Sequence, residues 1–118
     1  AAISAAKELY PTERITGIFQ PHLYSRTQDF ALGFAQALDQ LDEVLLMDIY
    51  PAREKPIVGV TSDMLFKLMK NPVKKRVSKE NLLHELELSA PKVLLTLGAG
   101  DIDRFIIPIK NWLSMIKA

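Results

Sequence analysis

The chain has 118 residues, with 15 Lys and Arg against 14 Asp and Glu, two His and no Cys. This length suits one domain with its own apolar core, and the near-neutral charge gives no electrostatic reason to expect binding to nucleic acid or to a membrane surface. The lack of cysteine excludes disulfides, thiolate metal sites and a cysteine nucleophile. With 48% hydrophobic and 25% charged residues, the composition is typical of a folded globular protein.

The beginning of the chain is predicted to be a helix over residues 1–9 that opens without an initiator Met or a capping residue. We therefore expect a piece of a longer protein. No charged segment followed by an apolar segment signals secretion. The longest apolar runs, residues 44–47 and 105–109, are far shorter than the roughly 20 residues that a membrane span needs. These features predict a cytoplasmic protein.

The first half of the chain alternates strand and helix patterns. Residues 14–19 are short, β-branched and bounded by breakers, which predicts a strand. After a loop, Ser25 and Gln28 fit a capping box that opens a helix. Residues 43–49 form a nearly continuous apolar run, as expected of a parallel strand that is buried on both faces. The predicted apolar stripe of the helix between these strands consists of Phe30, Phe34, Leu38 and Leu41.

The second half continues the alternation. Thr61 or Ser62 is predicted to cap a helix that ends near residue 71, before a proline. A short strand is expected at residues 75–77, a helix at 79–88 and a strand at 92–97. A last helix is predicted over residues 101–117, interrupted at Pro108. This order predicts an α/β domain with a mostly parallel sheet.

Ligands of such sheets bind at the carboxyl ends of the strands, so three loops are candidates: residues 20–26, 48–54 and 98–101. The first loop places His22, Tyr24, Ser25 and Arg26 beside a helix N-terminus, which favours an anion. Arg26 could hold a carboxylate or phosphate with two hydrogen bonds. The alternative is equally open: Ser25 only caps the helix, Tyr24 packs and Arg26 is solvated.

The other two loops carry weaker signals. Asp48 follows a buried strand, where it would hold His22 or Arg26, lie near a metal-bound phosphate, or cap the turn. Gly98 and Gly100 form a Gly-x-Gly pattern, but Asp103 stands where a dinucleotide fingerprint has its third glycine. This pattern indicates a tight strand-to-helix turn or a close backbone approach to a ligand.

Several motifs are missing from the sequence. It has no P-loop for ATP, no His pair or carboxylate cluster with metal-ligand spacing, and no Gly-x-Ser-x-Gly elbow. The chain alone therefore shows no complete catalytic machinery. A basic run between residues 67 and 79 is interpreted as a solvated face, and His84 as an exposed side chain.

Four segments together carry a family resemblance. They are Q-P-H-L-Y-S-R-T with the Phe-rich helix after it, E-V-L-L-M-D-I-Y-P-A-R-E, P-I-V-G-V-T-S and L-G-A-G-D-I-D. In this order they closely resemble the C-terminal domain of the Mur ligases, over essentially the whole chain. The resemblance implies a Rossmann-like, three-layer domain over residues 1–118, which binds the amino acid and closes the active site.

The resemblance also implies a function for the longer protein. This is an ATP- and Mg²⁺-dependent ligase that joins L-alanine to UDP-N-acetylmuramate in peptidoglycan synthesis. ATP and the UDP substrate would be bound mainly by a central ATPase domain and an N-terminal domain, so the fragment alone is expected to be inactive. Two alternatives remain open: another Mur-type ligase that recycles intact tripeptide, and a non-catalytic α/β binding module.

Site residues follow from the same resemblance. Arg26 would bind the alanine carboxylate and His22 would shape its pocket, while Leu23 stands where many relatives have an arginine. The turn from Gly98 to Asp101 corresponds to a segment that lines the amino-acid site in sister ligases. The full set of predicted substrate-binding residues is His22, Tyr24, Ser25, Arg26, Asp48, Gly98 and Gly100.

Overall fold

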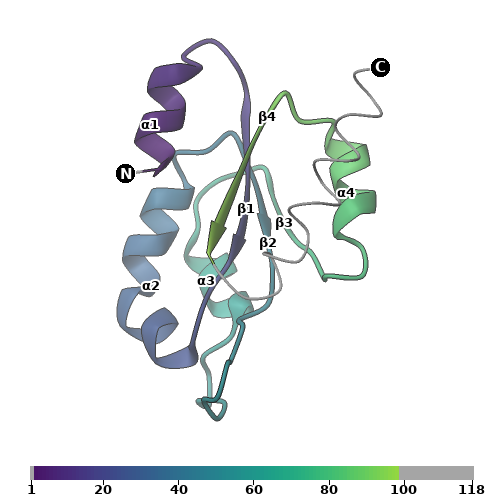
Figure 1. Cartoon of the computed structure of the whole chain (residues 1–118). Helices are drawn as coiled ribbons and strands as arrows, with labels where there is room; N and C mark the ends of the chain where they lie inside the picture. The colour runs from purple at the N-terminus through teal and green to yellow at the C-terminus, as the bar shows by residue number, and fades with distance from the viewer. Residues whose placement is uncertain (1, 99–118) are drawn as a thin grey trace.

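A computed structural model describes residues 2–98 as helices and parallel strands in strict alternation (Figure 1). The elements are α1 (Ala2–Leu9), β1 (Ile15–Gln20), α2 (Tyr24–Leu38), β2 (Glu43–Leu46), α3 (Ser62–Leu68), β3 (Lys74–Arg76), α4 (Leu82–Ser89) and β4 (Val93–Gly98). The predicted α/β class is confirmed. The predicted helix at 101–117, with Gly100 and Asp101, lies outside the described residues.

The sheet has the strand order β3-β2-β1-β4, and every pairing in it is parallel. Gly17 in the middle of β1 lies opposite Val44 of β2 on one side and Leu95 of β4 on the other. All residues of β1 and β2 are buried, which explains why these segments read as continuous apolar runs. Parallel pairing brings the carboxyl ends of the strands to one edge of the sheet.

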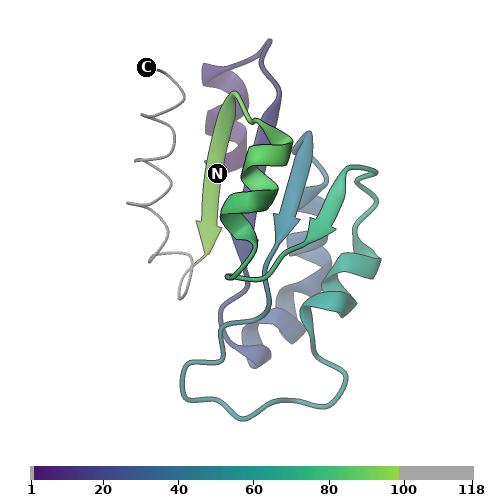
Figure 2. The ribbon, with the colours of Figure 1, turned by 90° about the vertical axis from the view of Figure 1, so that its right-hand side faces the viewer.

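Helices cover both faces of the sheet, so the domain has three layers. Figure 2 shows α4 in front of the sheet and the other three helices behind it. On the face of α1, α2 and α3, Ile3, Ala35 and Leu65 pack with β-strand residues such as Val44. On the opposite face, Leu82 and Leu86 of α4 pack against side chains that include Ile18. Within residues 2–98, every helix is too short or too polar to span a lipid bilayer.

Helix α2 departs from its predicted stripe. Phe30 has non-helical backbone angles, with φ −116° and ψ 15°, and 57% of its surface is exposed. The ring of Phe30 still lies beside that of Phe34, with centroids 6.2 Å apart, but it is the most exposed member of the predicted stripe. The buried residues of α2 are Thr27, Ala31, Ala35 and Leu38.

Candidate functional site

A cavity of about 440 Å³ opens where β1 and β4 end, on the face that α1 and α2 cover. It is lined by Ile3, Phe19, Gln20, His22, Arg26, Phe34, Ala37, Leu38, Leu97 and Gly98. We call it the α2-side cavity. It brings together His22 and Arg26 from the first predicted loop and Gly98 from the third, although these loops are far apart in the sequence.

A second cavity, of about 250 Å³, lies at the same edge of the sheet and is called the α4-side cavity. Its lining consists of Gln20, Met47, Asp48, Ser78, Lys79 and Glu80. Asp48 is therefore separated from the other predicted site residues, because it lines this cavity and not the first one. Gln20 lines both cavities, and its Nε2 donates a hydrogen bond to the backbone oxygen of Asp48 at 3.2 Å.

The first and second predicted loops are joined by backbone hydrogen bonds. Leu23 N–H donates to the carbonyl oxygen of Tyr50 at 2.9 Å, and Tyr50 N–H donates to that of Pro21 at 2.8 Å. The rings of His22 and Tyr50 stack, with centroids 5.9 Å apart and planes 15° from parallel. The half-buried His22 is thus held from the side of the second loop.

The start of α2 differs from the predicted capping box. Leu23, not Ser25, is the N-cap residue, and its side chain cannot form a capping hydrogen bond. Ser25 lies within the first turn, where its N–H donates to Glu54 Oε1 at 3.1 Å and its Oγ–H to Glu54 Oε2 at 2.5 Å. The prediction that Ser25 caps the helix is wrong, because a carboxylate from the second loop satisfies this turn instead.

Glu54 ends the second predicted loop, and the sequence indicates no more for it than a surface or interface residue. The hydrogen bond from the Ser25 side chain lowers the pKa of Glu54 most, and the Ser25 N–H, the Tyr24 N–H and the nearby His22 lower it further. Burial raises this pKa, but less than those contacts lower it. A charged carboxylate of the chain itself therefore occupies the N-terminus of α2, where the sequence predicted a ligand anion.

Arg26 is the cation that remains at the α2-side cavity. Its side chain is exposed, and it forms no ion pair with any carboxylate among residues 2–98. Much of the rest of the wall is apolar and includes Phe19, Phe34 and Leu97. A small molecule with one carboxylate and a short apolar part suits this combination of a free guanidinium and apolar walls.

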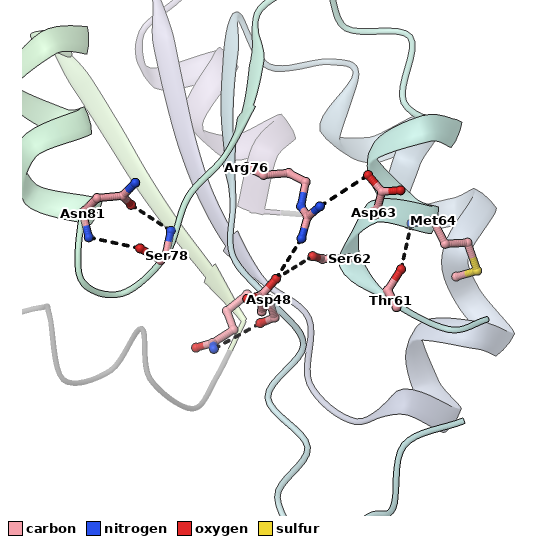
Figure 3. A network of polar contacts seen from close by, with 9 residues as sticks. Asp48, Thr61, Ser62, Asp63, Met64, Arg76, Ser78 and Asn81 are labelled. Carbon is pink, nitrogen blue, oxygen red and sulfur yellow. Dashed lines mark hydrogen bonds and ion pairs between the residues drawn. The ribbon is translucent and has the colours of Figure 1, made fainter. Parts of the chain in front are cut away.

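Asp48 has other partners than His22 or Arg26. Its Oδ1 accepts a hydrogen bond from Ser62 Oγ at 3.0 Å and pairs with Arg76 Nη2 at 3.3 Å (Figure 3). Strand β2 ends at Leu46, so the Asp48 side chain emerges past the buried part of the sheet and is exposed. Arg76 also pairs with Asp63 at 3.4 Å, and this network ties the end of β2 to α3 and β3.

Gly98 ends β4 in a conformation that requires glycine. Its φ is +99°, and a Cβ added there would lie 2.0 Å from the backbone oxygen of Gln20. The close backbone approach that the Gly-x-Gly pattern suggested is therefore made to β1 of the same chain. This approach forms one wall of the α2-side cavity.

Comparisons with known proteins agree with the family resemblance. No family model matches the chain. It is 55% identical to a UDP-N-acetylmuramate–L-alanine ligase from Porphyromonas gingivalis over 117 residues, which are 98% of this chain and 26% of the relative. It is 52% identical to the same ligase from Flavobacterium johnsoniae over 114 residues, which are 97% of this chain and 25% of the relative. It is 56% identical to that from Cytophaga hutchinsonii over 110 residues, which are 93% of this chain and 24% of the relative. The chain is therefore homologous, over nearly its whole length, to the UDP-N-acetylmuramate–L-alanine ligases, and it spans about a quarter of their length.

Proposed function

We propose that this chain is the C-terminal, amino-acid-binding domain of a UDP-N-acetylmuramate–L-alanine ligase of peptidoglycan synthesis. The observation that carries the proposal is the 55% identity to such a ligase over 98% of the chain. In this role the domain positions L-alanine and closes the active site over it. Binding of a small zwitterion needs a few placed charges and no strong field, which suits a net charge of +1.

The α2-side cavity supplies the contacts for the amino acid. Arg26 binds the alanine carboxylate through charge-assisted hydrogen bonds, and its free guanidinium supports this role. His22 shapes the pocket from its position against Tyr50. Gly98 forms the wall where β4 approaches β1, and Ser25 contributes through the first turn of α2.

ATP and Mg²⁺ are assigned to the other domains of the ligase. Residues of those domains would hold both groups, ATP would phosphorylate the muramoyl carboxylate, and Mg²⁺ would neutralise charge in that step. The sequence of this chain has no P-loop, and residues 2–98 contain no cluster of three or more His, Asp or Glu side chains placed to hold a metal ion. We therefore assign neither group to a residue described here.

Replacing Arg26 with alanine in the complete ligase tests this function. Arg26→Ala should raise the KM for alanine ten-fold or more, because a hydrogen bond to a charged group contributes about 1.5–3 kcal/mol. The KM for ATP should not change. Steady-state kinetics at varied alanine concentration gives the measurement.

The matched control is Arg14→Ala, which removes an exposed arginine just before β1, at the amino edge of the sheet. This variant should keep the wild-type KM for alanine. An Arg26→Ala enzyme with an unchanged alanine KM would exclude Arg26 from the site.

A further inference from the structure

The first turn of α2 is held both by groups outside the helix and by Thr27 of the helix itself. Leu23 has φ 70° and ψ 140°, a conformation that residues other than glycine rarely adopt. Its N–H donates a hydrogen bond to the carbonyl oxygen of Tyr50 at 2.9 Å. Its own carbonyl oxygen accepts from Thr27 N–H at 3.1 Å and from the Thr27 hydroxyl at 2.7 Å. Backbone of this kind persists only where its surroundings fix it.

Glu54 is the charged member of these surroundings. Its two carboxylate oxygens each accept one hydrogen bond from Ser25, one from the backbone and one from the side chain. Backbone and side chain of Ser25 are thus fixed together. A carboxylate at this place also interacts favourably with the positive end of the helix.

Glu54 does not line the α2-side cavity, whereas Arg26, the residue after Ser25, does. We infer that Glu54 is a positioning residue, which holds the first turn of α2 and with it the guanidinium of Arg26 at the cavity. This inference rests on the proposed function, in which Arg26 binds the alanine carboxylate. Glu54 acts through Ser25 and does not touch the amino acid.

The contact also directs where the ligand carboxylate binds. Because Glu54 already accepts the Ser25 N–H, that donor is not offered to a second carboxylate. On this turn the carboxylate of the amino acid therefore binds to the side chain of Arg26 and not to the N–H of Ser25. Loss of Glu54 would both loosen the turn and free a competing donor.

The first measurement needs no ligand. Amide hydrogen exchange at Ser25, followed by NMR in this chain, should be about ten-fold faster in Glu54→Gln, because the charged acceptor is lost. Glu54→Ala should exchange faster still. Glu13→Gln, which changes an exposed glutamate before β1, is the control and should leave Ser25 unchanged. Wild-type exchange at Ser25 in both Glu54 variants would overturn the inference.

The second measurement uses the complete ligase. Glu54→Gln should raise the KM for alanine about five-fold and leave the KM for ATP unchanged. In the double variant with Arg26→Ala, Glu54→Gln should add little, because the group that it positions is gone. A merely structural defect would instead add its full effect and raise the KM for ATP as well, which would overturn the inference.

The two proposals fail in different ways. If Arg26→Ala leaves the alanine KM unchanged, the proposed site is wrong whatever Ser25 shows. If Arg26→Ala raises this KM but Glu54→Gln does not, the site stands and the positioning role of Glu54 is wrong.

Discussion

Two glycines of the described chain have opposite surroundings. Gly98 combines a positive φ with a backbone oxygen 2.0 Å from the place of its missing Cβ. Gly33 lies on the exposed side of α2, and a Cβ added there would meet nothing within 4 Å. The first position can hold only glycine without moving β4 away from β1, whereas glycine in the second only weakens a helix.

Substitution by alanine should therefore have opposite effects at these positions. Gly98→Ala should lower the free energy of unfolding by about 2 kcal/mol or more, through strain and the clash with β1. Gly33→Ala should raise it by about 0.5–1 kcal/mol, the difference in helix propensity. Urea unfolding followed by circular dichroism measures both. A Gly98→Ala chain as stable as the wild type would contradict the described contact with Gln20.

The site residues differ in how well the sequence predicts them. His22 and Arg26 could be predicted to share a site, because they follow a strand and open a helix, where ligands of parallel sheets bind. The role of Glu54 could not be predicted, because a capping box pairs residues three apart in the sequence, whereas this carboxylate comes from another loop. For Asp48 the sequence left open a contact with His22 or Arg26, a metal-bound phosphate or a turn cap, because the direction of its side chain depends on where β2 leaves the sheet.

The connection from α3 to β3 depends on two polar side chains. Lys74 Nζ donates to the carbonyl oxygens of Phe66 at 2.8 Å and Met69 at 2.6 Å, and so satisfies the end of α3. The basic run that contains Lys74 was interpreted as a solvated face, and for this half-buried lysine that interpretation is wrong. Asn71, only 4% exposed, donates to the carbonyl oxygen of Leu41 at 2.6 Å.

Truncating Asn71 tests this connection. Asn71→Ala should lower the free energy of unfolding by about 2–3 kcal/mol, because it leaves the Leu41 carbonyl and the Val73 N–H without their partner. Gln36→Ala, which truncates an exposed amide on α2, should change it by no more than about 0.5 kcal/mol. Thermal unfolding of the three proteins gives the comparison. Equal stabilities would show that the buried amide contributes nothing.

Elements were easier to predict than their ends and faces. The alternation of short apolar runs with helical patterns predicts the order of strands and helices, and Thr61 caps α3 as expected, accepting from Met64 N–H at 3.2 Å. The run at 43–49 forms a strand only to Leu46, because the chain then turns into the second loop. The kink at Phe30 likewise has no signal in the sequence, because the apolar pattern continues through this residue.

At the scale of the whole molecule, the described fold has two cavities at the edge of the sheet where the parallel strands end. The α2-side cavity offers apolar walls and the guanidinium of Arg26, which pairs with no carboxylate among residues 2–98, and these are contacts for binding a small molecule. Phosphoryl transfer needs a cradle for phosphate as well, and the sequence has no P-loop. Binding and chemistry are thus divided between domains under the proposed function.

The isolated 118-residue chain should therefore show no alanine-dependent hydrolysis of ATP. Release of inorganic phosphate, measured with and without alanine and UDP-N-acetylmuramate, should stay at the level of a sample without protein. The complete ligase serves as the positive control. Alanine-dependent release by the isolated chain would contradict the proposed division.

The pairing of β1 with β4 has a consequence for synthesis of the protein. β1 is made well before its second neighbour in the sheet, β4, which is complete only after residue 98 has been made. Closing so long a loop is entropically unfavourable and makes folding slow. Until then one edge of β1 has no partner strand, and an unpaired strand edge is a template for aggregation. Among the described elements β4 comes last in the chain, so the wall that Gly98 and Gln20 form can be completed only after the other described strands have been made.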